Sequence, residues 1–434
     1  YTTYYGAMAI IGAVLLAFGI GLNVFEASAG LGKTLYDLPW FIGIIGVALL
    51  GSGLSKALKG RRSPGLTVPV GAEHTKKFLL NNAILLALAV LVVIICIQEH
   101  SFMQIRVMKD ILAQASPRVI IALGICFTLL IAGTDLSACR MVGLAAVISA
   151  SMMQTADYAN RFYPDLPQIP VIFAIAAAIL ACMVFGALNG FLVARFDMHP
   201  FIATLAVQVM IYGACSLYFD MEPNKSQPIG GIRDDFSAIG KLKILTSDFV
   251  ERIPIIGKLF GGISILILIA IVFIVAIWFV LNYTVFGKNV YAIGGNREAA
   301  VVSGINVPLT IMGGNMTSAK VSGINVNKYL VIVYTIAGAL SGLAGVVLAA
   351  RVSSGQSSMG MSYELDAIAA CVVGGVSLNG GVGKVSGILS GVLIFQVIQY
   401  GLQFIGISPM WQQIIKGIII AAAVAIDMSK YNKK

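Results

Sequence analysis

The feature that most constrains this chain is a series of apolar runs of about twenty residues, the length at which an α-helix crosses a hydrocarbon core. Membrane-spanning β-strands are shorter and alternate strictly between apolar and polar residues, and the sequence lacks that pattern. The chain is 58% hydrophobic and only 11% charged, whereas about a quarter of the residues in a typical soluble domain are charged. We therefore expect an all-α, polytopic helical membrane protein.

Charge orients the expected spans. Two spans, 8–24 and 40–58, precede a linker rich in lysine and arginine, which the positive-inside rule places in the cytoplasm. Ten more are expected at 78–97, 117–132, 137–153, 168–194, 200–220, 263–282, 328–350, 364–378, 385–405 and 409–427. With this count, both termini are cytoplasmic and most later basic loop residues fall on the same side: Lys288, Arg297, Lys320, Lys328 and Lys384.

The same count divides the chain into regions. Residues 1–75 form two extra transmembrane helices and a basic linker, and residues 76–434 form a ten-helix core. A polar loop at 221–262 is expected to be extracytoplasmic, and a second long loop at 284–328 to be cytoplasmic. The stretch 100–118 contains three basic residues that the count places outside, so we expect it to be an amphipathic surface segment. The first apolar run lacks a cleavage site and is expected to be a retained helix.

The long cytoplasmic loop contains a repeat. "IGGNREAAVVSGINV" at 293–307 is followed nineteen residues later by "MGGNMTSAKVSGINV" at 312–326, with ten of the fifteen positions identical. The second copy has Thr317 where the first has Glu298.

Several kinds of chemistry are disfavoured by the sequence. Two stretches resemble phosphate-binding loops, "ASAGLGKT" at 27–34 and "LNGGVGKV" at 378–385, but both lack the leading glycine and lie between membrane spans. The cysteines lie inside apolar runs and the histidines are isolated, so no metal site or disulfide is expected. No serine is paired with a histidine as in a catalytic triad. We expect no catalytic residue, no cofactor and no nucleic-acid partner; the basic residues flank the spans, as anionic lipid favours.

Polar side chains inside the spans are the candidates for a transport pathway, because charge at membrane depth is costly. Asp135 lies at an expected break in "GTDLSACR", and Arg140 follows it in the sequence. Asn189 and Gln396 add uncharged hydrogen-bonding groups. Capping of the next helix is an equally good explanation for Asp135, and interhelical hydrogen bonding for the amides. Glu364 and Asp366 are better explained as acids in the first turn of a helix.

From about residue 78 onward the chain resembles the permease subunits of bacterial sugar ABC importers, and among them those for galactose and methyl galactosides. The resemblance is carried, in order, by "IIALG", "GTDLSACRMVGLAA", "NGFLVARFDMHPFIATLA", "FGKNVYAIGGNREAAVVSGINV", "YELDAIAACVVGGVSLNGGVGKVSGILSGVLIF" and "WQQIIKG". Residues 1–75 have no counterpart in that family.

The resemblance implies a permease in the bacterial inner membrane that acts as a pair of copies and takes sugar from an extracytoplasmic binding protein. It implies no enzymatic activity of the chain's own, since a separate ATPase subunit hydrolyses ATP. The ATPase would bind the cytoplasmic loop at Glu298, Ala299, Ala300 and Gly304. Family members carry one copy of the repeat, so the first copy is expected to make this contact and the second to be an insertion.

Two alternatives stay open. The cargo could be ribose, xylose or a nucleoside. A channel or ion-coupled secondary transporter using Asp135 and Arg140 as a pair would have inverted repeats with broken helices in both halves. The sequence shows no second break like "GTDLS", which counts against this alternative.

Overall fold

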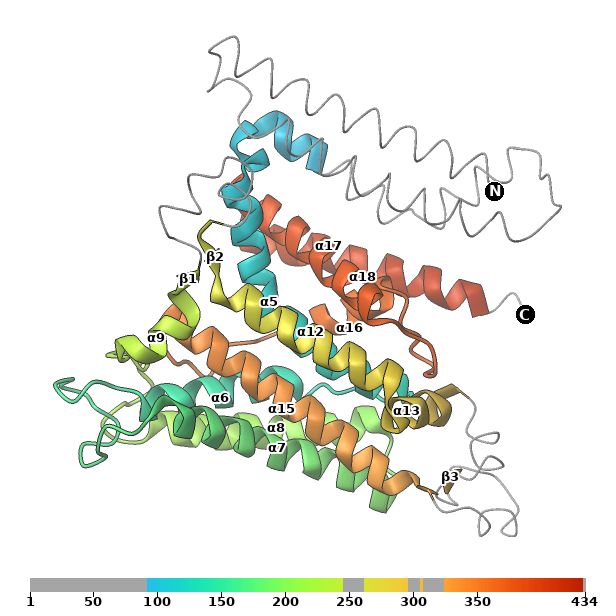
Figure 1. Cartoon of the computed structure of the whole chain (residues 1–434), viewed down its shortest axis with the longest axis horizontal. Helices are drawn as coiled ribbons and strands as arrows, with labels where there is room; N and C mark the ends of the chain where they lie inside the picture. Colours follow the sequence, from blue (N-terminus) through green and yellow to red (C-terminus); the bar gives the residue numbers. More distant parts are fainter. Residues whose placement is uncertain (1–91, 245–260, 296–304, 307–323, 432–434) are drawn as a thin grey trace. The chain divides into compact units, whose positions relative to one another are not determined.

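The computed structural model describes residues 92–244, 261–295, 305–306 and 324–431. These residues are mainly helical, which confirms the all-α prediction (Figure 1). The main elements are α5 (Ile105–Leu130), α6 (Ala138–Met152), α7 (Val171–Phe196), α8 (Pro200–Asp220), α9 (Asp234–Lys241), α12 (Ile265–Tyr283), α13 (Val285–Gly295), α15 (Val326–Val352), α16 (Tyr363–Val373), α17 (Val385–Phe404) and α18 (Pro409–Tyr431). The expected spans at 8–24 and 40–58, and most of 78–97, lie outside the described residues.

Six of the described helices are long and apolar enough to cross a membrane: α5, α7, α8, α12, α15 and α17. The structure divides into two compact units, and the larger comprises 112–396 and 415–434. Within it, α5 and α15 are the most buried of these helices, whereas α12 exposes large apolar side chains such as Val272 and Phe279. Exposed apolar faces such as those of α7, α8 and α12 are typical of surfaces that contact lipid or another protein.

Close helix packing in the larger unit depends on small residues. α15 runs alongside α7 and α6 (Figure 1). A side chain at Gly338 of α15 would lie 2.5 Å from the Cys182 carbonyl oxygen of α7, and one at Gly186 would overlap the Tyr334 carbonyl oxygen. Backbones that approach this closely gain dispersion energy along their whole length, which is how helices associate in lipid.

Two predicted spans are shorter than expected. α6 has 15 residues and α16 has 11, which at 1.5 Å per residue gives only about 22 and 16 Å. Irregular segments, 131–137 before α6 and 374–384 after α16, continue each of them. We call the glycine-rich stretch 374–384 the second break; it covers the boundary that the sequence placed between the expected spans 364–378 and 385–405.

The stretch 100–118 was also predicted wrongly. It was expected to be a surface segment, but α5 begins at Ile105 and continues through Pro117 without interruption. Proline removes one backbone donor inside a helix, and here the preceding Ser116 hydroxyl donates to the Leu112 carbonyl at 2.9 Å. Arg118 therefore lies inside a long helix.

The smaller unit contains residues up to Ile111 together with 397–414. Its described core is a cluster of Ile95, Phe102, Val107 and Ile111. The ring of Phe102 packs edge-on against that of Phe404, with centroids 5.5 Å apart. Aromatic packing therefore joins the 3-10 helix His100–Met103, just before α5, to the end of α17 within this unit.

The two copies of the repeat pair with each other. β3 (Ile305–Asn306) and β4 (Ile324–Asn325) are parallel, with Ile305 opposite Ile324 and Asn306 opposite Asn325. Each residue therefore lies beside its own equivalent in the other copy. A second short pair, β1 (Lys243–Ile244) with β2 (Ile263–Ser264), is antiparallel and closes the loop before α12.

Candidate functional site

The break between α5 and α6 is held by side chains from two neighbouring helices. Thr204 of α8 accepts a hydrogen bond from the Leu136 amide at 3.2 Å. Tyr334 of α15 directs its hydroxyl at the Thr134 carbonyl, 3.5 Å away. Irregular backbone at membrane depth must have its polar groups satisfied by protein, so these contacts explain why the chain can leave helical geometry here.

Asp135 and Asn189 meet through Ser137. Oδ1 of Asp135 accepts hydrogen bonds from the Ser137 amide at 2.9 Å and from its hydroxyl at 2.6 Å. Asn189 of α7 donates through Nδ2 to the same hydroxyl at 2.7 Å. All three side chains are fully buried. Two of the four predicted pathway residues are thus brought together, and the capping explanation for Asp135 holds in part, because Ser137 precedes the first residue of α6.

Several buried oxygens around this break have no hydrogen-bond partner among the described residues. They include Oδ2 of Asp135, Oδ1 of Asn189 and Oε2 of Glu364. Each is an acceptor, and a buried acceptor without a partner costs about 1–3 kcal/mol. A hydrogen-bond donor that reached these oxygens would offset this cost.

Arg140 lies apart from Asp135. Its guanidinium carbon is 4.4 Å from the centre of the Tyr212 ring of α8. The neighbouring Cys139 thiol interacts with the Glu364 carboxyl of α16. Within the described part of the chain no ion pair joins Asp135 and Arg140, so the ion-coupled pair of the alternative model has no structural support.

Gln396 belongs to a different place. It is buried on α17 and donates through Nε2 to Oε1 of Gln114 on α5, 3.4 Å away. This bond is the interhelical hydrogen bonding that was the competing explanation for Gln396. The four predicted pathway residues therefore do not form one cluster.

A group of buried charges was not predicted from the sequence. Asp366 of α16 lies 3.0 Å from Nζ of Lys416 on α18 and 3.9 Å from the Arg118 guanidinium on α5. Arg118 also lies over the Tyr363 ring, 4.8 Å from its centre. The sequence explained Asp366 as an acid in the first turn of a helix. In the structure its main contacts are these ion pairs. The available signal was only that Arg118, Asp366 and Lys416 are charged residues in a chain with few charges.

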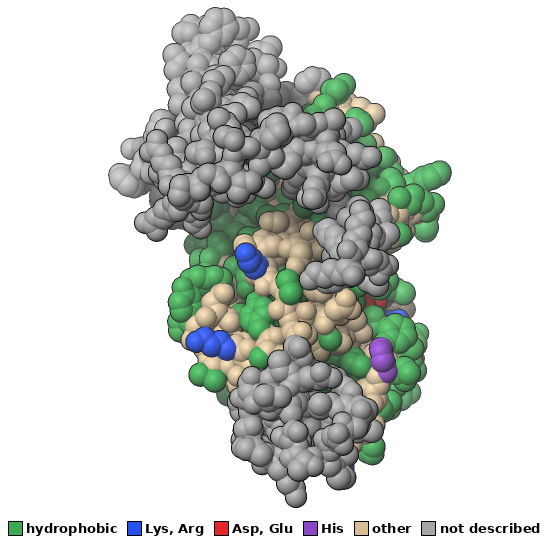
Figure 2. All heavy atoms as spheres, turned by 90° about the vertical axis from the view of Figure 1, so that its right-hand side faces the viewer, with side chains coloured by type: hydrophobic (Ala, Val, Ile, Leu, Met, Phe, Trp, Pro, Cys, Tyr) green, Lys and Arg blue, Asp and Glu red, His purple; other side chains and the backbone are tan. Residues whose placement is uncertain are grey.

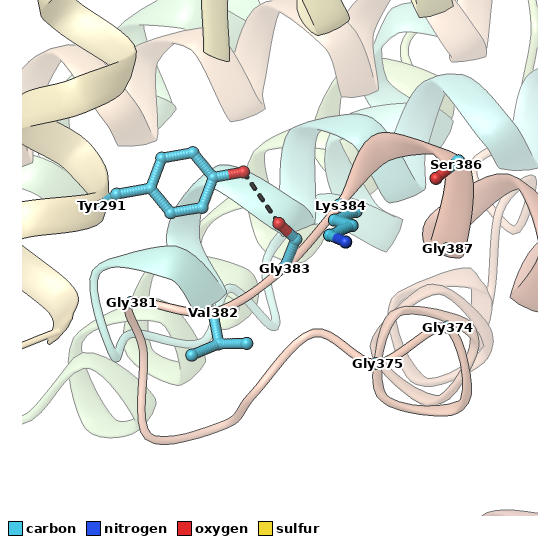
Figure 3. A pocket seen from close by; sticks show the side chains of 9 residues that line it. All are labelled: Tyr291, Gly374, Gly375, Gly381, Val382, Gly383, Lys384, Ser386 and Gly387. Carbon is cyan, nitrogen blue, oxygen red and sulfur yellow. Dashed lines mark hydrogen bonds between the residues drawn. The ribbon is translucent and has the colours of Figure 1, made fainter. Parts of the chain in front are cut away.

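A shallow cavity of about 330 Å³ lies next to the second break. Five glycines contribute to its lining, together with Val382, Lys384, Ser386 and Tyr291 of α13 (Figure 3). The Tyr291 hydroxyl donates to the Gly383 carbonyl at 2.9 Å, and burial raises the pKa of Tyr291 to about 12. The stretch "LNGGVGKV" lies here between α16 and α17, where a phosphate-binding loop would need a preceding strand.

Glu298, Ala299, Ala300 and Gly304, the predicted ATPase contacts, lie outside the described residues. The helix that leads to them, α13, is described, and the side of the molecule on which it lies is the one drawn in Figure 2. Much of the described surface there consists of backbone and of uncharged polar side chains, drawn in tan. Basic side chains, drawn in blue, lie among them (Figure 2). Lys288 of α13 and Lys384 are exposed.

Comparison with known proteins gives consistent results. A family model described as "Branched-chain amino acid transport system / permease component" matches residues 107–312 and 308–424. The division between the two matched stretches falls between the two copies of the repeat. No solved structure matches the chain.

The chain is also similar to characterised permeases. It is 43% identical to the galactose/methyl galactoside import permease protein MglC of Haemophilus influenzae, over 83% of this chain and 98% of that protein. Identity to MglC of Escherichia coli K12 is 40%, over 82% and 96%. The ribose import permease protein RbsC of Escherichia coli K12 is 33% identical, over 84% and 98%. The chain therefore belongs to the permease family described as the branched-chain amino acid transport system permease component.

Proposed function

We propose that this chain is the membrane-spanning permease subunit of an ATP-driven importer of galactose and methyl galactosides. The observation that carries the proposal is 40–43% identity along nearly the whole length of galactose/methyl galactoside permeases. The buried acceptors at the break agree with it, because a hexose presents several hydroxyl donors. A multi-pass position in the bacterial inner membrane follows from the family and from the six apolar helices.

The partners follow from this role. A separate ATPase subunit supplies the energy, an extracytoplasmic binding protein delivers the sugar, and two copies of the permease form the pathway. The ATPase contacts Glu298, Ala299, Ala300 and Gly304 in the first copy of the repeat. Both chain termini face the cytoplasm, an orientation supported by the basic residues near α13 and the second break.

The pathway passes the break between α5 and α6. Asp135 and Asn189 each present one oxygen without a partner among the described residues, and these oxygens accept hydrogen bonds from sugar hydroxyls as the cargo passes. Arg140, half-buried against Tyr212, contacts the sugar from α8's side of the break. Gln396, which does not belong to this cluster, contacts the sugar at another point of the pathway through Oε1, which likewise has no described partner.

A second candidate cargo is ribose, favoured by 33% identity to ribose permeases over nearly their whole length. The lower identity places it second. A ribose importer would use the same partners, so only the cargo distinguishes the two.

Reconstitution in liposomes tests the proposal. The chain is combined with the ATPase and sugar-binding subunits of its own importer, and uptake of labelled galactose and labelled ribose is followed with and without ATP. We expect ATP-dependent galactose uptake that needs both partners, and its loss in Glu298→Arg. ATP-dependent uptake of ribose alone would reassign the cargo, and uptake driven by an ion gradient without partners would overturn the proposal.

A further inference from the structure

Three segments of the larger unit meet backbone to backbone. They are the end of α13 at Gly294, the end of α5 at Leu130, and the second break at Gly380 and Gly381. The Gly381 amide donates to the Leu130 carbonyl at 2.9 Å. A Cβ on Gly294 would overlap that same carbonyl oxygen and lie 2.7 Å from the Gly381 nitrogen.

The contact is close from the other side as well. A Cβ on Gly380 would lie 2.7 Å from the Gly294 carbonyl oxygen and 2.9 Å from the Ala132 nitrogen. Gly380 and Gly381 also have positive φ angles of 85° and 69°, a conformation that glycine adopts without strain. We call this meeting point of Gly294, Gly380, Gly381 and Leu130 the glycine joint.

The glycine joint connects two parts of the molecule that have different roles. Gly294 is the second residue of the first copy of the repeat, and Glu298 follows four residues later. Leu130 ends α5, and Asp135 follows it in the break. The end of the helix that leads to the proposed ATPase-binding residues and the end of the helix that leads to the proposed sugar-contacting residues therefore meet through backbone atoms.

Further contacts keep α13 in place against its neighbours. Tyr291 donates to the Gly383 carbonyl, as Figure 3 shows. Asn289 donates to the Tyr329 hydroxyl of α15 at 2.7 Å, and the Phe286 ring stacks on the Tyr329 ring with centroids 5.5 Å apart. These bonds hold α13 against the start of α15 and the second break, so a displacement of α13 reaches both.

We propose that the glycine joint transmits movement of the ATPase-binding segment to the α5–α6 break, with Gly294 as its positioning residue. A contact between backbones has no side-chain rotamer that can absorb a displacement, and packed protein interiors transmit strain. A shift of α13 therefore moves Leu130 and the break with it. This inference rests on the proposed function, since it assigns a coupling route within that importer.

Gly294→Ala and Gly295→Ala form a matched pair. They are neighbours in the same helix, but a Cβ on Gly295 meets nothing closer than the Gly381 Cα at 3.7 Å, an ordinary contact. In the reconstituted importer we measure sugar uptake and ATP hydrolysis stimulated by the loaded binding protein. We expect Gly294→Ala to bind the ATPase and hydrolyse ATP while uptake falls about tenfold or more, because the gating movement is disturbed. Gly295→Ala should stay within about twofold of the unmodified chain.

Tyr291→Phe serves as a second variant, because it removes the hydroxyl bond to Gly383 without adding an atom and so is expected to fold. We expect it to raise the ATP hydrolysed per sugar transported by about two- to fivefold, since a looser link makes each cycle less productive. The proposed role of the glycine joint would be overturned by either of two results. One is equal sugar uptake by Gly294→Ala and the unmodified chain, and the other is an unchanged ratio of ATP hydrolysed to sugar transported in Tyr291→Phe. Absence of ATP-dependent uptake by the unmodified chain would instead overturn the proposed function, so the two failures differ.

Discussion

Nζ of Lys416 lies 3.0 Å from Oδ1 of Asp366, and the two side chains are only 13% and 8% exposed. With Arg118 nearby on α5, this pair joins three helices that are far apart in the sequence. A charge withdrawn from solvent is tolerated mainly because its partner is present. The pair therefore fixes how α16 and α18 pack.

Lys416→Met tests the energetic role of the pair. Removing one partner leaves Asp366 buried with only the more distant Arg118, so we expect the free energy of unfolding to fall by about 3–5 kcal/mol. Thermal unfolding of the purified chain in detergent measures the loss.

The control is Lys225→Met. Lys225 and Glu222 are also 3.0 Å apart, but their side chains are 69% and 73% exposed. Solvent screens such a pair, and its loss should cost less than about 1 kcal/mol. Equal losses from the two substitutions would show that burial of the Lys416 pair is unimportant.

Ser137→Ala should destabilise the α5–α6 break. The hydroxyl both donates to Asp135 and accepts from Asn189, so its removal leaves two buried groups with fewer partners, at about 1–3 kcal/mol. Ser149→Ala is the matched control, because that buried hydroxyl donates only to carbonyls of its own helix. Unfolding in denaturant compares the two, and a larger loss for Ser149→Ala would contradict the role of Ser137.

Tyr212 offers a test of the aromatic contact to Arg140. Tyr212→Phe keeps a ring beneath the guanidinium and should leave stability unchanged, whereas Tyr212→Leu should cost about 0.5–2 kcal/mol. The melting temperatures of the two variants, compared with that of the unmodified chain, measure these effects on stability. If phenylalanine and leucine behave alike at this position, the guanidinium does not depend on the ring.

Two deletions of equal length test the repeat. Deleting 308–326 joins Val307 to Asn327 and restores a single copy before α15, so we expect ATP-dependent uptake close to that of the unmodified chain; shortening a surface loop changes its closure entropy by only about 0.6 kcal/mol or less. Deleting 312–330 also removes nineteen residues, but it takes away the first turn of α15 after Val326, including the buried Leu330. That variant should lose uptake. Loss of ATPase binding in the first deletion would show that the second copy makes the contact.

The sequence predicts an element of this fold when the element has a local sequence pattern, and misses it when the element depends on distant contacts. Long apolar runs identified α7, α8, α12 and α15 with nearly correct bounds, because burial in lipid needs a fixed length. The start of α5 was missed because three basic residues and Pro117 resemble a loop, and the compensating partner of Arg118 is Asp366, 248 residues away. Contacts of that range leave no local pattern.

The candidate site was predicted unevenly for the same reason. Asp135 was recognisable as a charge at a break, and Asn189 as an amide at membrane depth. That they share Ser137 depends on how α7 packs against α6, which no spacing reveals. The second break coincides with the expected boundary between the spans 364–378 and 385–405, but α16 ends at Val373, earlier than the apolar run suggests, and Gly375 follows with a positive φ.

The parallel pairing of β3 with β4 has a consequence for how this loop changes in length. Because Asn306 lies opposite Asn325, a chain that skips from the first copy to the second arrives at an adjacent, parallel position with every following residue unchanged. A gene that carries two similar stretches can gain or lose one of them by misaligned recombination. Either event leaves the sequence that joins the loop to α13 and to α15 unchanged. The loop can therefore change in length between generations without changes in the membrane-spanning helices.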